Sequence, residues 1–203
     1  LVEELKAEGS ARYEALIQLA VMLEMLATDG ARSEIQNLAE VLRNSDAIET
    51  ICDLMGSDHP RAPQAALISL QALAMDGLDS KSAETRARIH AHGSIRHVVP
   101  HLFSSDLAIS SVASQIVNHL LIDDAGPQTS LAVVGALNEA NGIDRLRVLA
   151  RMDASQPGQD GLVTAARGCL TKLMESVERA NASSVVVKAV TRLQSARRRR
   201  IAQ

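Results

Sequence analysis

Four of the six histidines stand close together near the middle of the chain, and they are the residues best suited to bind a metal. His97 and His101 are four residues apart, which places two imidazoles on one face of a helix, and His90 and His92 lie just upstream. Zinc accepts imidazole nitrogens in a tetrahedral shell. Neither cysteine is near, and the carboxylates around these histidines are scattered. We therefore expect a solvated polar helix face, with no metal and no cofactor.

No catalytic constellation is recognisable in the sequence. Ser, His and Asp all occur, but there is no Gly-x-Ser-x-Gly elbow, no phosphate-binding loop, no His-Glu-x-x-His motif and no dinucleotide fingerprint. The paired carboxylates Glu3-Glu4 and Asp123-Asp124 stand in a terminus and in a polar break, where solvent exposure or helix capping explains them. We therefore expect a protein that is not an enzyme and that has no catalytic residues.

The last candidate for a functional site is the run Arg197-Arg198-Arg199-Arg200. Four adjacent guanidinium groups repel one another, so this tail should be a frayed helix end or disordered. It could direct the protein to the nucleus, contact phosphate groups of RNA or lipid, or dock on an acidic protein. Alternatively, the run is the C-terminus of a helix, where the helix dipole favours cations. Because the first sixty residues are acidic, head-to-tail association of two chains is also open.

The composition favours close-packed helices. The chain has 203 residues, is 46% hydrophobic and carries a net charge of −3, yet it holds one Phe, one Tyr and no Trp. An all-β domain would use more aromatic residues, and so would a surface that stacks single-stranded nucleic acid. This length suffices for one domain or one run of stacked repeats.

Cysteine usage and hydropathy indicate an intracellular, reducing compartment, either cytoplasmic or nuclear. Cys52 and Cys169 fall in different expected repeats, so we expect no internal disulfide. No apolar run approaches the roughly 20 residues that a membrane span requires. The chain begins at Leu1 and not at Met, as a processed or partial form would. An organelle, reached through a targeting peptide that is then removed, is therefore the alternative compartment.

A short motif occurs three times at nearly constant spacing. Its copies are Asp46-Ala47-Ile48, Gly93-Ser94-Ile95 and Asn141-Gly142-Ile143, and each begins a short apolar run that a polar break separates from a longer one. A fixed period of roughly 47 residues indicates stacked helical repeats, in which no unit buries its hydrophobic face alone.

The longer apolar runs share one pattern of core residues. A small residue is followed by larger ones at i+4 and i+7, which lie on one stripe of a helix. The four copies are Ala15, Leu19 and Met22; Ala66, Leu70 and Leu73; Ala113, Val117 and Leu120; and Ala166, Leu170 and Leu173. The third repeat holds extra residues at 153–161, which we expect to form a surface loop.

These features together resemble the armadillo repeat. The clearest copy runs from Gly93 through Phe103, continues with the turn Ser104-Ser105-Asp106-Leu107, and ends with Ala108 through Ile122. The resemblance implies an all-α, armadillo-like right-handed helical-repeat superhelix, an α-solenoid, with HEAT repeats as close cousins. Pro100 lies deeper in its helix than the proline of the family and should kink or shorten that helix.

In armadillo proteins the third helices line a concave face that holds extended peptides or partner helices. The resemblance places this face at the two positions between the core residues of each third helix. Import receptors and β-catenin-like proteins carry polar ladders there, and import receptors add tryptophans. In this chain the first half of the face is apolar and the second half is polar; the chain has no Trp, and none of the eight positions is Asn. The implied positions are Ile17, Val21, Ile68, Ala72, Gln115, His119, Gly168 and Lys172.

We therefore expect about three repeats plus a partial first one over residues 1–176, and a C-terminal capping helix with the Arg-rich tail over 177–203. The expected function is a protein–protein interaction module or adaptor. The alternatives are a structural subunit of a larger assembly, whose basic tail contacts nucleic acid, lipid or an acidic partner, and a chaperone cofactor. The apolar strip of the concave face is either exposed for a partner or covered by the N-terminal segment or by further sequence.

Overall fold

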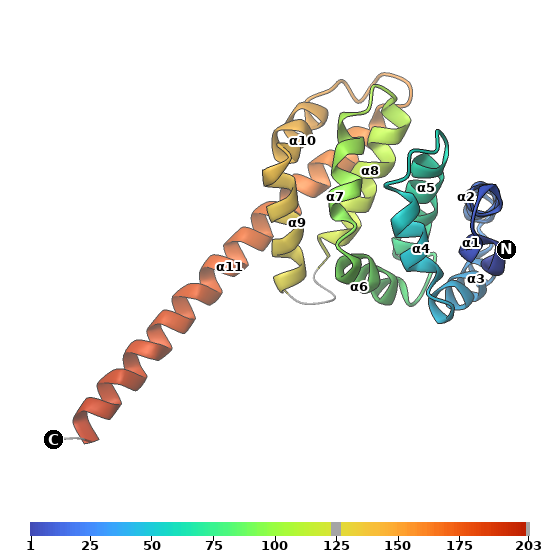
Figure 1. Cartoon of the computed structure of the whole chain (residues 1–203). Helices are drawn as coiled ribbons and strands as arrows, with labels where there is room; N and C mark the ends of the chain where they lie inside the picture. The colour runs from blue at the N-terminus through green and yellow to red at the C-terminus, as the bar shows by residue number, and fades with distance from the viewer. Residues whose placement is uncertain (123–126, 202–203) are drawn as a thin grey trace.

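The computed structural model describes the backbone of residues 1–122 and 127–201, and the side chains of these residues except those of 127–130, 180 and 183–201. Every regular element in this part of the chain is a helix (Figure 1). The elements are α1 Val2–Lys6, α2 Ser10–Thr28, α3 Arg32–Asn44, α4 Ala47–Leu54, α5 Ala62–Ala74, α6 Ser82–His92, α7 Ile95–Val98, the 3-10 helix η1 Val99–Phe103, α8 Leu107–Leu120, α9 Pro127–Glu139, α10 Gly142–Ala150 and α11 Asp160–Ile201.

The helices repeat in groups of three. The groups are α3-α4-α5, then α6 and α8 with α7 and η1 between them, then α9-α10-α11; α1 and α2 precede them as a partial unit. The third helices α2, α5, α8 and α11 pack against one another in chain order. Figure 1 shows the groups following one another along the molecule. The all-α repeat architecture that the sequence predicts is therefore confirmed.

The three copies of the opening motif make the same backbone turn. Their first residues, Asp46, Gly93 and Asn141, have φ values of 55°, 72° and 55°. This left-handed conformation crowds the Cβ atom of most residues, and Gly, Asn and Asp are the types that adopt it most readily. The motif therefore recurs because each repeat needs one left-handed residue between its first and second helices.

The stripes of the third helices form the core. Ten of the twelve stripe residues are buried, and they belong to one continuous hydrophobic cluster. The exceptions, Met22 and Leu170, are partly buried because each lines an apolar groove at one end of the stack. A small residue on each helix lets its neighbour approach closely, and the larger residues fill the space between them.

Pro100 shortens the second helix of its repeat, as the sequence predicts. The α-helical part ends at Val98, and the chain continues as the 3-10 helix η1. Proline has no backbone N–H to donate, and its ring clashes with the carbonyl four residues earlier. Residues 153–159 of the expected loop 153–161 form turns between α10 and α11, whereas Asp160 and Gly161 already belong to α11.

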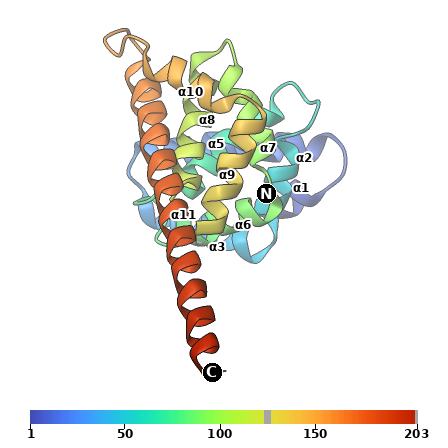
Figure 2. The ribbon, with the colours of Figure 1, turned by 90° about the vertical axis from the view of Figure 1, so that its left-hand side faces the viewer.

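The last helix is much longer than the others. α11 has 42 residues and runs without a break from Asp160 to Ile201. Its first part packs on α8, α9 and α10, and its second part extends away from the stacked helices (Figures 1 and 2). The expected boundary between residues 176 and 177 falls inside this continuous helix. The division of the chain there remains a prediction.

Candidate partner-binding surface

The apolar half of the predicted concave face lies between α2 and α5. Ile17 and Val21 from α2 and Ile68 from α5 line one cleft, and Ile68 and Ala72 line an adjoining cleft of about 400 Å³. The side chain of Val21 is 50% exposed, whereas Ala72 is only 4% exposed and forms part of the cleft wall. The structure therefore brings these four predicted residues together, and we call them the apolar strip. Glu24, Arg61 and Gln64 line the same clefts beside them.

The polar half begins where α5 meets α8. Gln115 of α8 accepts a hydrogen bond from Gln71 of α5 at 2.9 Å, and it donates to Ser111 at 3.3 Å. Gln71 also lines the larger of the two clefts. Sequence reasoning missed Gln71, although it stands one turn after Ile68 on the same helix. Its amide links the apolar strip to the polar half.

His119 of α8 and Lys172 of α11 lie close together farther along the face. The Lys172 ammonium donates to the backbone oxygen of Asn118 at 2.8 Å. A Cβ atom on Gly168 would lie 3.1 Å from the Asn118 side chain, so this glycine allows α8 and α11 to approach closely. The polar half of the surface is therefore built across two consecutive repeats.

Two residues that the sequence did not single out complete this region. Arg86 of α6, whose side chain is 3% exposed, contacts Asp76 at 2.7 Å and donates to the backbone oxygen of Ala74 at 2.7 Å. Asp76 also accepts a hydrogen bond from Ser82 at 2.8 Å. Because Asp76 follows α5 and Arg86 belongs to the next repeat, only the folded arrangement reveals that they contact each other.

The electrostatics of this region follow from burial. Burial is the largest cause of the low pKa of His119, about 4, and the positive charge of Lys172 lowers that pKa further. The pKa of Lys172 is also lowered, again mainly by burial. We call Asp76, Arg86, His119 and Lys172 the basic cluster, because it combines the cationic side chains of Arg86 and Lys172 with the carboxylate of Asp76.

The four histidines that the sequence analysis considered as metal ligands contact different groups. The Nε2 atom of His90 lies 2.9 Å from the backbone oxygen of Leu120, and that of His92 lies 3.1 Å from Asp53. His97 belongs to α7 and packs against Gly56, while His101 lies in η1. In the described part of the chain, no three His, Cys, Asp or Glu side chains gather as a metal site would require.

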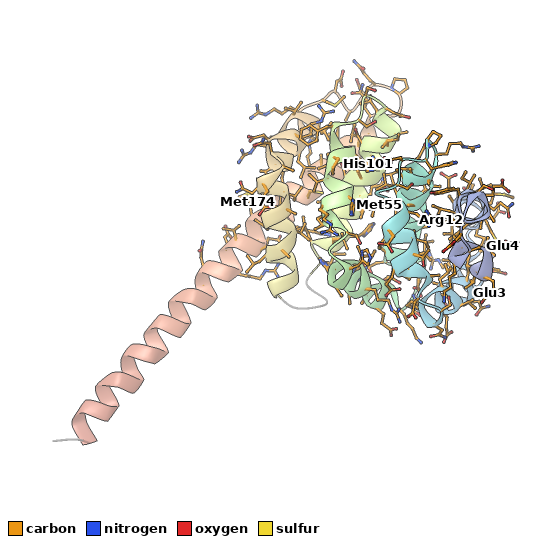
Figure 3. The ribbon with its side chains drawn as sticks, in the orientation of Figure 1. Glu3, Glu4, Arg12, Met55, His101 and Met174 are labelled. Carbon is orange, nitrogen blue, oxygen red and sulfur yellow. The ribbon has the colours of Figure 1, made fainter. Side chains whose placement is uncertain are left out.

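The two ends of the stack are apolar. At the N-terminal end, a groove on α2 includes Val21 and Met25, and the Met25 side chain is 62% exposed. At the other end, a groove of about 410 Å³ between α9, α10 and α11 includes Val177 and Met174, which is 66% exposed. Figure 3 shows Met174 near the crossing of α9 and α11, at the opposite end from Glu3.

The basic tail belongs to the second part of α11. The helix backbone includes Arg197, Arg198, Arg199 and Arg200, but their side chains lie outside the described residues. In the part of the chain described here, no helix combines the length and the apolar character needed to cross a membrane.

Solved structures with a similar fold provide the comparison. An engineered protein is 19% identical and superposes with a TM-score of 0.58, covering 92% of this chain and 69% of its own. A structure of computationally designed armadillo repeat proteins for modular peptide recognition is 15% identical and has a TM-score of 0.60. The match covers 86% of this chain and 68% of that chain. A designed armadillo repeat protein in complex with the peptide (KR)4 is 12% identical and has a TM-score of 0.51. The match covers 81% of this chain and 70% of that protein. No protein-family model and no curated sequence matches. The chain thus has the fold of an armadillo-like α-solenoid.

Proposed function

We propose that this chain is a non-catalytic protein-binding module that holds a segment of a partner protein along the third helices. The observation that carries the proposal is the apolar strip, where Ile17, Val21 and Ile68 line open clefts between α2 and α5. Burying such side chains stabilises a complex by about 25 cal/mol for each Å² of apolar surface removed from water. The amphipathic helix of a partner, or an extended segment with apolar residues, supplies matching surface.

The mode of binding differs from a polar grip on a peptide backbone. The eight predicted groove positions hold neither Asn nor Trp, so the strip offers apolar area where a polar ladder would offer amide groups. The amides of Gln71 and Gln115 already bond to each other. The designed protein for modular peptide recognition supports the proposal at the level of the fold only.

A pair of matched substitutions tests the proposal. Ile68→Glu places a charge in the clefts, whereas Val41→Glu changes a 52% exposed valine on α3, the first helix of the same repeat. We expect phage-displayed random peptides selected on the native chain to lose binding to Ile68→Glu and to keep binding to Val41→Glu. Circular dichroism should show both variants folded. Equal binding by both variants would contradict the proposal.

Val21→Glu provides a second variant that separates binding from folding. Val21 is half exposed, so a glutamate there remains solvated and the helix should persist. If both Val21→Glu and Ile68→Glu unfold the protein, the strip is a covered part of the core and does not bind partners. If both fold and fail to bind the selected peptides, the strip is the binding surface.

A structural subunit of a larger assembly is the second candidate, and the C-terminal end groove favours it. Val134, Ile143, Leu173 and Met174 form an apolar surface beside the second part of α11. In stacked repeats such an end is usually covered by a capping repeat with a polar outer face. Sedimentation at low and high salt distinguishes the candidates: an adaptor stays monomeric, and an obligate subunit self-associates or aggregates.

A further inference from the structure

The second part of α11 extends away from the stacked helices and carries an apolar face (Figures 1 and 2). Val186, Val190 and Leu193 stand at i, i+4 and i+7, which places them on one face of the helix. Ala182 and Ala189 belong to the same face. Valine is not a strong helix former, and most of the stability of a helix in a protein comes from the packing of its apolar face. We therefore expect another element to cover this face.

This face, which we call the apolar seam of α11, follows the period of paired helices. Val186 and Leu193 are seven residues apart, and so are Ala182 and Ala189. Apolar residues with a seven-residue repeat keep one side of a helix turned toward a neighbouring helix. Because the apolar seam alternates between larger residues and alanines, a second helix fits when each larger residue meets an alanine. A second copy of α11 meets this requirement.

A hollow begins the apolar seam at the point where α11 leaves the stack. Its volume is about 460 Å³, and its lining residues are Glu175, Glu178, Arg179 and Ala182, which are all exposed. They stand at i, i+3, i+4 and i+7, the spacing of the four residues that receive one side chain of the facing helix in a coiled coil. Glu178 also lines the end groove between α9, α10 and α11. The surface for a second helix therefore begins at the stack itself.

The charges of α11 favour one orientation of such a pair. Glu175 and Glu178 stand where the apolar seam begins, and the four arginines 197–200 stand near its end. Two parallel copies would bring arginine to arginine and glutamate to glutamate, and like charges repel. Two antiparallel copies bring the Arg-rich end of each helix beside the glutamates of the other. The separation of charge along α11 therefore favours the antiparallel pair.

We propose that the second part of α11 pairs with the same segment of a second copy of this chain in antiparallel orientation. In the register that matches larger residues with alanines, Leu193 lies opposite Ala182 of the other copy, and Val186 lies opposite its Ala189. Because the pair has two-fold symmetry, each of these contacts occurs twice. None of these residues lines the clefts between α2 and α5, so the pairing does not depend on the proposed function.

The same register brings opposite charges together at both ends of the pair. Arg200 is level with Glu175 of the other copy, and Arg199 is within one turn of its Glu178. Such contacts near the surface contribute little affinity, but they disfavour the parallel arrangement. The apolar seam supplies most of the affinity, because burying it removes apolar surface from water.

Sedimentation equilibrium of the full chain at micromolar concentrations tests the pairing. Val186→Glu places a charge on the apolar seam, whereas Val187→Glu makes the same change about 100° farther around the helix. We expect the parent protein and Val187→Glu to form a dimer, and Val186→Glu to raise the dissociation constant about a hundredfold, because both copies lose an apolar contact. Circular dichroism checks that the stack stays folded in both variants. A monomeric parent protein, as another occupant of the apolar seam would require, overturns the proposal, and so does equal weakening by both variants.

Val186→Glu also serves the comparison of the two candidate functions. The parent protein dimerises through α11 in either of them, so their comparison by sedimentation uses this variant, in which only other surfaces remain for self-association. A monomer then indicates an adaptor, and self-association indicates a structural subunit.

Disulfide cross-linking tests the orientation. Ala182→Cys combined with Leu193→Cys should link two copies under oxidising conditions, since these two positions face each other only in an antiparallel pair. Each single variant should stay unlinked, because its two equal positions lie about 16 Å apart along the helices. The native thiols of Cys52 and Cys169 are buried and do not interfere. A linked dimer of Ala182→Cys alone would show a parallel pair and overturn the proposal, as would an unlinked double variant.

Charge reversal tests the contacts at the two ends. Glu175→Arg combined with Glu178→Arg should weaken the dimer about tenfold, because arginines then face arginines. Arg199→Glu combined with Arg200→Glu should weaken it to a similar extent. A mixture of the two double variants should regain the affinity of the parent protein, since opposite charges meet again at both ends. A mixture as weak as the separate variants would overturn the proposed register.

Discussion

Arg43 of α3 and Asp79, which precedes α6, form an ion pair that joins the first and second complete repeats. Their side chains are 4% and 1% exposed. Arg43 also donates a hydrogen bond to Thr85 of α6 at 3.0 Å, and Asp79 accepts one from the backbone N–H of Lys81 at 3.0 Å. A buried charge is tolerated only when it is paired and hydrogen-bonded, so each partner depends on the other.

Asp79→Asn should therefore destabilise the fold strongly. Removing one partner of a buried pair leaves the other charge uncompensated, which costs about 3–5 kcal/mol. Asp144→Asn is the control, because the pair between Asp144 and Arg147 is 73% and 59% exposed and such pairs contribute only about 0–1 kcal/mol. Urea denaturation measures both. Similar losses in the two variants would show that the pair between repeats does not stabilise the stack.

The left-handed backbone at Asn141 gives a second prediction. Its side chain makes no capping hydrogen bond, so a substitution there tests the backbone conformation alone. Asn141→Ala should cost about 1 kcal/mol, and Asn141→Gly should change the free energy of unfolding by less than about 0.5 kcal/mol. Asn138→Ala, at an exposed helical position in α9, should be nearly neutral. Thermal unfolding compares the three, and an unaffected Asn141→Ala variant would contradict the explanation of the repeated motif.

Two glycines should respond to alanine in opposite directions. A Cβ atom on Gly142 would lie 2.7 Å from the Leu137 side chain and 3.3 Å from its backbone oxygen, whereas one on Gly135 meets nothing within 4 Å. Gly142→Ala should destabilise the third repeat by about 1–3 kcal/mol through overpacking. Gly135→Ala, inside α9, should stabilise it by about 0.5–1 kcal/mol. Denaturation midpoints of the two variants are then expected on opposite sides of that of the parent protein.

Stability should fall between pH 6.5 and pH 4 because of His119. Its pKa is about 4 in the folded protein and near 6.5 in the unfolded chain. The unfolded state therefore binds the proton first as the pH falls, which favours unfolding until the folded state is also protonated. The contribution is full above pH 6.5 and amounts to about 3 kcal/mol.

Urea denaturation of the parent protein and of His119→Gln at pH 7.5 and pH 4.5 isolates this contribution. His90 and His101 also have pKa values lowered by burial, so both proteins lose stability, and the variant should lose less. Identical losses would show that His119 does not titrate differently in the two states.

The cysteines should be unreactive in the folded protein. Cys52 and Cys169 are free and buried, and burial raises the pKa of each thiol to about 12. Because the thiolate is the reacting species, iodoacetamide at pH 8 should label neither until the chain unfolds. Intact mass spectrometry checks this, with Ser33→Cys, at an exposed position in α3, as a variant that labels at once. Rapid labelling of the native parent would show that the core opens readily.

The repeat pattern made the stacking predictable from sequence, because it records local requirements. Asp46 and Asn141 mark the left-handed turns, and the Ala66, Leu70 and Leu73 stripe marks the buried side of a third helix. The continuous α11 was not predicted: the sequence analysis placed a boundary between residues 176 and 177, although no Gly or Pro stands between Gly168 and Ile201.

The basic cluster was not predictable in this way. Asp76, Arg86 and Lys172 come from three consecutive repeats, and no spacing within one helix relates them. Their proximity depends on how far each repeat rotates relative to the previous one. That rotation is set by close packing at positions such as Gly168, whose role in the contact with Asn118 is visible only in three dimensions.

The length of α11 fixes a distance between two parts of the protein. At 1.5 Å per residue, the part beyond residue 179 measures roughly 30 Å, about the size of a small domain. The helix thus separates the Arg-rich end from the apolar groove between α9, α10 and α11. An extended chain spans at most about 3.3–3.6 Å per residue, so a peptide that contacts both parts needs at least about nine extended residues between its two points of contact.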